Sequence, residues 1–383
     1  MIEPASELEL GQAIADLSAP VEVRGGGTRG GLGRPVQAAE TLSTAGLRGI
    51  SLYEPGALTL VAGAGTPLSE IEAALAAENQ RLAFEPMDHR PLLGSGGEPT
   101  IGGVAACNVS GPRRVQAGAC RDAMLGVRFV DGAGRVVKNG GRVMKNVTGY
   151  DLVKLMGGSY GTLGVLTELA FKVLPMPEAS ATLVARGLDD AAAVAAMTAA
   201  LGSPFDVTGA AHLPDPGDPA DARTLVRIEG FEASVAYRAG RLRDLLSAQT
   251  QGEIEVLSEA ADLWAEVRDV RGFADRPGAV WRISVRPSDG PALAAAVPHL
   301  GVRYDWGGGL VWLLTEESDA AATTVRAEAA RLRGHATLVR APAALRASAG
   351  AFQPETPALA AISAGLRAKF DPRGLLNPGR MSA

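Results

Sequence analysis

Short apolar runs separated by turn residues predict a strand-rich N-terminal half. Residues 21–24 and 58–62 have the composition of short strands, and each leads directly into a glycine-containing turn. Residues 127–130 and 135–138 flank an Asp-Gly turn, which predicts a hairpin. The apolar stretch at 161–173 predicts a longer strand that closes this half of the chain.

A helix is predicted directly after the second of these strands. Leu68, Ile71 and Leu75 recur at spacings of three and four, so they fall on one helical face. Thr66 has a side chain suited to an N-cap, and Pro67 suits the first helical position. We therefore expect a helix that begins at Pro67 and is capped by Thr66.

The second half of the chain alternates strands with alanine-rich helices. Strands are predicted at residues 182–185, 224–228 and 280–285, and a second hairpin at 304–313. Helices are predicted near residues 189–201, 232–248, 259–269 and 318–333. This alternation predicts an α+β domain with a mostly antiparallel sheet.

Two prolines mark the boundary between these patterns. Neither the alternation typical of strands nor the spacing typical of helices continues through Pro175 and Pro177. The sequence therefore predicts one domain over residues 1–177 and a second over residues 178–350. Residues 351–383 remain as a C-terminal segment that is rich in proline and glycine near its end.

Composition narrows the possible classes of protein. Glycine occupies 48 of 383 positions, about 13% against a usual ~7%, and 29 of these glycines lie in residues 1–175. The formal charge of −5 argues against a general nucleic-acid binder. No apolar run approaches the ~20 residues that cross a bilayer, and the acidic start gives no indication of a signal peptide.

Cysteine and histidine are scarce, which limits metal chemistry. The two cysteines, Cys107 and Cys120, form no Cys-x-x-Cys pair, and the four histidines are scattered. This pattern excludes a zinc ribbon and an iron–sulfur cluster, and we expect no metal site.

The first glycine cluster, residues 24–33, predicts an anion-binding turn. Gly25, Gly27 and Gly30 formally match Gly-x-Gly-x-x-Gly, but more glycines and Pro35 follow, so the helix of a dinucleotide-binding fingerprint cannot form. Consecutive backbone N–H groups in such turns form nests for anions, and a pyrophosphate is the natural guest. The candidate residues are Arg24, Gly25, Gly26, Gly27, Thr28, Arg29 and Gly30.

Two further clusters of small residues follow, at 94–114 and at 145–164. In the first, small side chains at nearly every position would let a flat ligand lie against the backbone, with Thr100, Asn108 and Ser110 as hydrogen-bonding groups. The chain has no Walker lysine motif. It offers backbone groups rather than catalytic side chains, which indicates that the chemistry resides on a bound cofactor.

Three blocks resemble the FAD-binding domain of the vanillyl-alcohol-oxidase (PCMH-type) superfamily. They are residues 24–28, residues 100–114 and residues 161–168, and their order and spacing also match. The resemblance covers most of residues 15–176, and the ending at 370–380 is similar as well. It implies an α+β fold with a PCMH-type FAD-binding domain of two α+β subdomains, to which the C-terminal segment returns, plus an α+β cap domain.

Other segments resemble one branch of that superfamily, the smaller FAD-binding subunit of bacterial glycolate oxidases. These segments are residues 143–152, 155–161 and 305–309. The resemblance implies a cytoplasmic FAD subunit that reaches the inner membrane only through its complex. It also implies a larger FAD subunit and an iron–sulfur subunit as partners. Electrons would pass from glycolate through the flavin to an acceptor, which yields glyoxylate.

The resemblance assigns roles to individual residues. The loop from Gly25 to Thr28 would wrap the pyrophosphate, and Thr28 stands where relatives with a covalent flavin often carry histidine, so FAD should be bound non-covalently. Thr100, Gly102 and Gly103 would lie along the ribityl and isoalloxazine side. The remaining implied cofactor residues are Asn108, Gly111, Gly161, Gly164 and Val165.

The substrate site leaves alternatives open. Larger hydroxy-acid-oxidising relatives hold a metal with clustered histidines, whereas His212, His299 and His335 lack such a pattern. The glycolate site is therefore either degenerate or in another subunit. A self-sufficient oxidoreductase is the alternative, and a non-catalytic scaffold is a third possibility. The candidate carboxylate-binding residues of the self-sufficient enzyme are Arg282, Arg286 and Tyr304.

Overall fold

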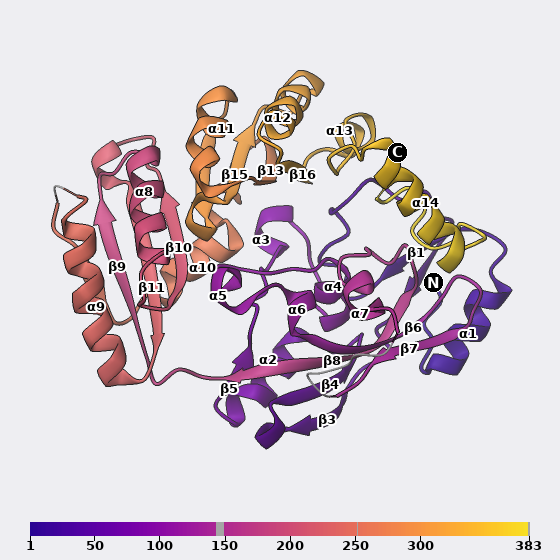
Figure 1. The fold of residues 1–383 in the computed structure, drawn as a ribbon. Coiled ribbons are helices and arrows are strands. Elements are labelled where there is room, and N and C mark those ends of the chain that lie inside the picture. Colours follow the sequence, from indigo (N-terminus) through magenta and orange to yellow (C-terminus); the bar gives the residue numbers. More distant parts are fainter. Residues whose placement is uncertain (143–148, 251, 382–383) are drawn as a thin grey trace. The chain divides into compact units, whose positions relative to one another are not determined.

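The computed structural model describes residues 1–142, 149–250 and 252–381, and these form two units. The first unit contains residues 1–110, 118–176 and 354 onward, and the second contains 111–117 and 177–353. The chain therefore enters the second unit twice, once through a seven-residue excursion. Figure 1 colours the elements along the chain. Residues 143–148, on which part of the predicted resemblance depends, lie outside the described residues.

The larger sheet of the first unit is antiparallel with the order β3-β4-β8-β6-β7, and β5 also pairs with β8. The strands are β3 (Ile50–Glu54), β4 (Thr59–Gly63), β5 (Gln80–Leu82), β6 (Met124–Val130), β7 (Val136–Gly140) and β8 (Val165–Pro175). The predicted hairpin is confirmed as β6 and β7. The long strand predicted from residue 161 begins at Val165 instead, because Gly161 has φ 71° and keeps the preceding residues in a turn.

A second, smaller group of elements completes the first unit. Strand β1 (Val21–Arg24) pairs in parallel with β2 (Glu40–Ser43), and helix α1 (Glu7–Asp16) buries Leu10 and Ile14. No helix follows the first glycine cluster, because the next element after β1 is β2. The other helices of this unit are α2 (Leu68–Ala77), α3 (Arg90–Leu93), α4 (Ile101–Ala106), α6 (Cys120–Ala123), α7 (Leu152–Met156) and α14 (Pro357–Phe370).

Helix α2 is present as predicted, but its cap is not. The helix begins at Leu68 with Pro67 as its N-cap residue, which is one position later than expected. The hydroxyl of Thr66 does not cap the helix, because it donates to the carbonyl oxygen of Gly63 at 2.7 Å and accepts from the N–H of Gly49 at 2.9 Å. Thr66 therefore ties the turn to the neighbouring loop.

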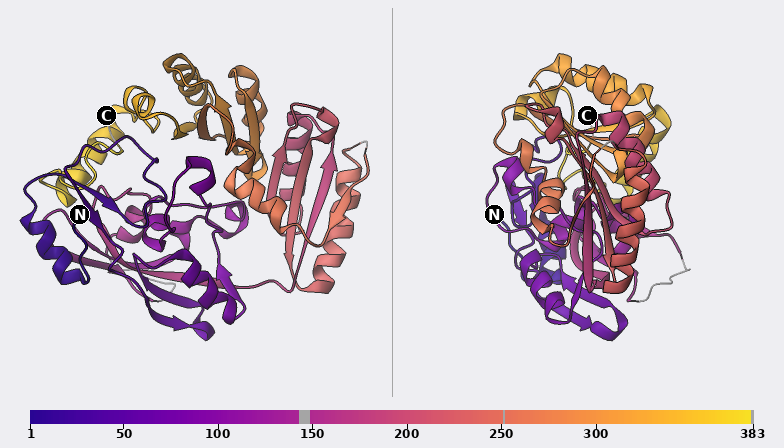
Figure 2. Two further views of the ribbon diagram at one scale, coloured as in Figure 1. Left: turned by 180° about the vertical axis from the view of Figure 1, so that it is seen from behind. Right: turned by 90° about the vertical axis from the view of Figure 1, so that its left-hand side faces the viewer.

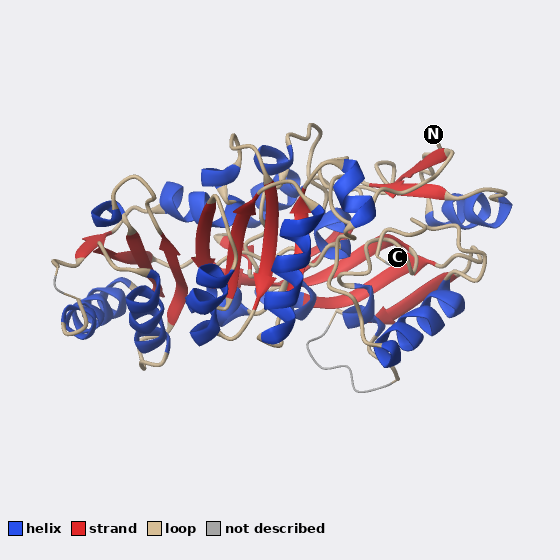
Figure 3. Cartoon of the chain, turned by 90° about the horizontal axis from the view of Figure 1, so that it is seen from above, coloured by secondary structure: helices blue, strands red, loops and turns tan. Residues whose placement is uncertain are grey.

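The second unit contains a fully antiparallel sheet of eight strands, in the order β12-β9-β11-β10-β14-β15-β13-β16. The strands are β9 (Ala179–Arg186), β10 (Val207–Leu213), β11 (Arg223–Gly230), β12 (Glu255–Leu257), β13 (Ala279–Ser284), β14 (Gly301–Asp305), β15 (Leu310–Thr315) and β16 (His335–Arg340). Figure 3 shows the strands in red. This arrangement confirms the α+β class with a mostly antiparallel sheet.

Alternate side chains of this sheet face two different helix layers. Leu183 and Val226 belong to a core shared with helices α8, α9, α11 and α12, whereas Val184 and Leu225 pack with Trp264 of helix α10. The helices are α8 (Asp190–Leu201), α9 (Glu232–Ser247), α10 (Ala261–Asp269), α11 (Gly290–Ala296), α12 (Asp319–Arg331) and α13 (Ala343–Ser348), with α5 (Arg114–Ala117) from the excursion. The right-hand view of Figure 2 shows helices lying along one side of the strands. The four helices predicted in this half are confirmed.

No helix within the described ranges is long and apolar enough to cross a membrane.

Candidate cofactor site

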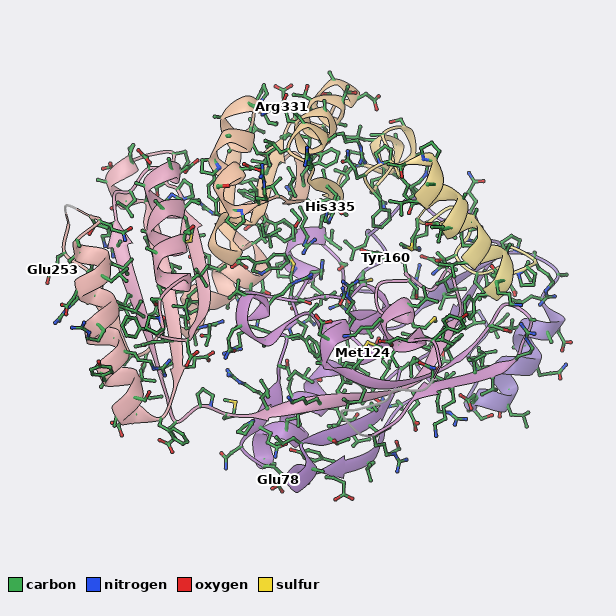
Figure 4. The ribbon with its side chains drawn as sticks, viewed as in Figure 1. Glu78, Met124, Tyr160, Glu253, Arg331 and His335 are labelled. Carbon is green, nitrogen blue, oxygen red and sulfur yellow. The ribbon has the colours of Figure 1, made fainter. Side chains whose placement is uncertain are left out.

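A cavity of about 740 Å³, including its open mouth, lies in the first unit where the glycine clusters meet. Twelve of the predicted cofactor residues line it, although they are spread over more than 140 positions of the chain. They are Arg24, Gly25, Gly26, Gly27, Thr28, Arg29, Gly30, Thr100, Gly102, Gly103, Gly161 and Gly164. Tyr160, labelled in Figure 4, also lines the cavity.

The first loop supplies unpaired backbone donors to this cavity. In the part of the chain that the structure describes, the N–H groups of Gly25, Gly26 and Gly27 have no hydrogen-bond acceptor. A side chain is excluded at two of these positions, since a Cβ on Gly25 would lie 2.4 Å from Oγ1 of Thr100 and one on Gly26 would lie 1.6 Å from the oxygen of Glu98. Gly27 has φ 79°, which favours glycine. The loop is therefore a cradle of free N–H groups of the kind that binds anions.

Helix α4 forms a second wall, made almost entirely of small residues. Thr100 is its N-cap, and its hydroxyl accepts from the N–H of Gly103 at 3.3 Å. The N–H of Gly102 donates to the oxygen of Ala64 at 2.8 Å, and a Cβ on Gly102 would lie only 2.7 Å from the Cβ of Ala64. The glycine thus lets this helix lie directly against the end of β4, which places the Thr100 segment beside the first loop.

The C-terminal segment closes the cavity, and sequence reasoning did not assign it to the site. Asn377 accepts from the N–H of Val23 at 2.8 Å and donates to the oxygen of Tyr160 at 2.8 Å. Arg380 donates to the oxygen of Leu32 at 2.9 Å and to Glu22 at 2.8 Å. Both line the cavity. The patterned ending at 370–380 was the only available signal, because these contacts join residues more than 200 positions apart.

Three predicted cofactor residues do not line the cavity. Val165 is fully buried in the core and pairs with Val130 of β6. The side chain of Asn108 accepts from the N–H of Arg121 at 3.0 Å, so it holds the start of helix α6. Gly111 lies in the second unit, where its carbonyl accepts from the indole of Trp306 at 3.1 Å. These three residues therefore have contacts within the protein, and none of them has the expected place beside the cofactor.

Two buried arginines, Arg29 and Arg380, line the cavity. Arg29 is 8% exposed, and its guanidinium donates at 3.3 Å to both Thr28 and the carbonyl of Met87, while Nε has no partner within the described residues. Burial lowers the pKa of Arg29, since a charged guanidinium loses hydration there. Burial also raises the pKa of Cys107, so this cavity-lining thiol is neutral near pH 7. The cavity therefore has a net positive polar surface.

These features fit FAD. The pyrophosphate requires free N–H donors and positive charge, which the glycine loop and Arg29 supply, and a planar ring requires walls of small residues, which α4 supplies. Thr28 is buried in the loop and has no nucleophilic imidazole for a covalent flavin link. Among the described residues, no group of three His, Cys, Asp or Glu side chains could hold a metal ion.

The three catalytic candidates of the second unit do not converge. In the sheet register Arg282 is opposite Trp312, whereas Tyr304 is opposite Val311, so these two side chains occupy opposite faces. Tyr304 is 1% exposed and donates its hydroxyl to Asp190 at 2.5 Å, which with burial raises its pKa.

Arg286 lies apart from both, because its exposed side chain pairs with Asp289 at 2.8 Å. Tyr304 is thus a core residue and Arg286 a surface residue. The guanidinium carbon of Arg282 lies 5.0 Å from the ring centroid of Trp306.

Comparisons with known proteins agree with this geometry. A family model described as an FAD binding domain matches residues 1–140. The solved structure of an alkyldihydroxyacetonephosphate synthase superposes with a TM-score of 0.69 at 16% identity, covering 98% of this chain and 76% of that one. The fold and the cavity together define a PCMH-type FAD-binding protein.

Sequence similarity extends over the whole chain for one relative. The glycolate oxidase subunit GlcE of Escherichia coli is 38% identical over 376 residues, which is 98% of this chain and 96% of that protein. The glycolate oxidase subunit GlcD of Bacillus subtilis is 37% identical over 132 residues, 34% of this chain and 27% of that protein. The chain belongs to the family of the glycolate oxidase subunit GlcE, within the FAD-dependent oxidoreductases.

Proposed function

We propose that this chain is the FAD-binding subunit of a glycolate oxidase complex that converts a small 2-hydroxy acid, glycolate, to its 2-oxo acid, glyoxylate. The observation that supports this most strongly is the glycine-lined cavity with its free N–H groups and buried Arg29, in a chain similar over its full length to GlcE. The chemistry that FAD supplies when bound is the acceptance of two electrons from the substrate and their transfer to an acceptor.

The residues of the chain bind and orient the cofactor. Gly25, Gly26 and Gly27 line the cavity, and their N–H groups, which have no acceptor among the described residues, would hold the pyrophosphate. Arg29 would balance negative charge there, because its side chain is buried and incompletely hydrogen-bonded. Gly102 and Gly103 keep the helix wall flat, so that a ring can lie against it.

The proposed complex contains a larger FAD subunit and an iron–sulfur subunit in addition to this chain. The names of the relatives GlcE and GlcD, which are subunits of glycolate oxidases, support a multi-subunit enzyme. A partner that accepts electrons is consistent with this role, because electrons accepted by the flavin must leave it before the next turnover. The complex would be cytoplasmic and would meet the inner membrane through its other subunits.

Reconstitution tests this proposal. The chain is purified alone and together with its two partner subunits, with FAD added, and glycolate-dependent reduction of a dye acceptor is measured for each preparation. Activity of the complex that is lost when this chain is omitted supports the proposal. Full activity of the two other subunits without this chain would refute it. Full activity of this chain alone would instead favour a self-sufficient oxidoreductase.

A further inference from the structure

A tryptophan flanked by two arginines lies in the second unit. The guanidinium carbon of Arg114 is 4.7 Å from the ring centroid of Trp306, and that of Arg282 is 5.0 Å from the same centroid. Arg114 comes from the excursion at 111–117, Arg282 from β13, and Trp306 from the turn between β14 and β15. Three segments far apart in the chain therefore bring two positive charges to one indole ring.

The excursion is fastened to the second unit by two residues on the N-terminal side of Arg114. The indole N–H of Trp306 donates to the carbonyl of Gly111 at 3.1 Å. Arg113 forms a paired interaction with Glu229, at 2.8 Å and 3.0 Å, and the carboxylate side chain is 4% exposed. Because Glu229 belongs to β11, the sheet itself sets the position of this segment. The approach of Arg114 to Trp306 is thus built into the fold of the unit.

The backbone of Trp306 is held in an unfavourable conformation. Its φ is 53°, in the left-handed region that a bulky side chain disfavours, and Gly307 and Gly308 follow with φ 68° and 102°. The carboxylate of Asp305 accepts from the N–H of Trp306 at 2.7 Å and fixes this turn. Strained residues that the surrounding structure maintains are concentrated at binding and active sites.

A third basic side chain joins this group from the neighbouring strand. In the register of β13 and β16, His335 is opposite Ser284 and Thr337 is opposite Arg282, so His335 and Arg282 share one face of the sheet. Figure 4 labels His335. Partial burial and the positive charges of Arg282 and Arg114 lower the pKa of His335, which leaves it neutral near pH 7 and able to hydrogen-bond.

We propose that Arg114, Arg282 and His335 form an oxyanion site around Trp306 that binds the carboxylate of a small acid. Guanidinium groups bind carboxylates through paired, charge-assisted N–H donors. The proposal rests on the proposed function and adds to it, since it assigns binding of the 2-hydroxy or 2-oxo acid to this chain itself, without a metal.

Binding of oxalate, glycolate and glyoxylate to the full chain loaded with FAD tests this site. Oxalate is the non-reacting probe, the other two distinguish substrate from product, and chloride and sulfate serve as unspecific anions. Isothermal titration gives the Kd, and quenching of tryptophan fluorescence reports whether the ligand lies near an indole. We expect saturable oxalate binding that competes with glycolate and is little affected by chloride.

Two substitutions and one control identify the residues. Arg282→Met and Arg114→Met are each expected to weaken oxalate binding by about 10- to 100-fold, in line with charged hydrogen bonds. Arg186→Met is the control, because Arg186 belongs to the same sheet but forms only an exposed pair with Glu255. The flavin spectrum and FAD content of each variant show whether the chain still folds and binds its cofactor.

The outcomes separate this site from the proposed function. Normal FAD content with no saturable oxalate binding to the wild-type chain would overturn the site and leave the FAD subunit intact. Equal oxalate affinity of the wild-type, Arg282→Met and Arg114→Met proteins would also overturn the site and leave the FAD subunit intact. Weakening by Arg186→Met as strong as that by Arg282→Met would show binding to general surface charge and would also refute the site.

Discussion

The most direct structural perturbation of the cofactor cradle is Gly26→Ala. A Cβ at this position would lie 1.6 Å from the carbonyl oxygen of Glu98. A normal carbon–oxygen separation is about 3.3 Å, so the loop or the Glu98 segment must move by roughly 1.7 Å. Such overpacking costs about 1–3 kcal/mol. Because the loop can relieve the contact only by displacing its free N–H groups, we expect this cost to appear in FAD affinity.

The expected result is an FAD Kd raised by about 5- to 150-fold, at 1.4 kcal/mol for each factor of ten. The assay is titration of apoprotein with FAD, followed by flavin fluorescence. Gly96→Ala is the matched control, since a Cβ there meets nothing within 4 Å and its backbone is not in the left-handed region. Unchanged FAD affinity in Gly26→Ala, with normal folding, would refute the assignment of this loop to the cofactor.

Three further predictions concern single side chains. Arg29→Met removes one of the two buried arginine charges of the cavity and should weaken FAD binding by about 10- to 100-fold, with partial recovery in Arg29→Lys; equal affinities would exclude Arg29 from the site. Cys107 should react slowly with iodoacetamide at pH 8 in the apoprotein and faster only at higher pH, because burial raises its pKa and the thiolate is the reactive form. Peptide mass analysis measures the extent of alkylation at each pH, and a midpoint at or below pH 8.5 would contradict this prediction. Glu229→Gln leaves the Arg113 guanidinium without its buried carboxylate and should destabilise the second unit by about 3 kcal/mol in urea unfolding, whereas Glu255→Gln, in an exposed pair, should change stability by less than about 1 kcal/mol.

Local periodicity was sufficient to predict most elements of the second unit. Helices α8 and α12 coincide with alanine-rich runs of the sequence, and the hairpin of β14 and β15 follows the apolar residues on either side of its glycine turn. The cap of helix α2 could not be predicted in this way, because Thr66 has a suitable side chain but bonds to Gly49, which lies 17 positions away. An N-cap preference depends only on neighbouring residues, whereas the hydrogen bond that competes with it forms between segments that only the folded chain brings together.

The glycine clusters identified the cavity but not the role of each glycine. Gly102 and Gly164 are required by contacts with Ala64 and Phe129, so a glycine that lines the cavity can be there for packing as well as for a ligand. The sequence alone cannot separate these two causes. It also could not place Asn377 beside Tyr160, because only the folded chain joins positions that far apart.

The substrate candidates do not lie together, for a different reason. Arg282 and Tyr304 both lie on predicted strands, but the register between β13, β15 and β14 places them on opposite faces. A shift of one residue would reverse that result, and strand register cannot be obtained from a single sequence. The approach of Arg114 to Trp306 could not be predicted either, because it depends on contacts between residues far apart in the chain.

The visible absorption spectrum of the purified full chain tests the central claim most directly. After incubation with FAD and gel filtration, the account predicts flavin bands with about one FAD per chain, and complete release of the flavin into the supernatant on acid precipitation, since Thr28 offers no covalent link. A correctly folded chain that emerges without flavin bands would contradict the account.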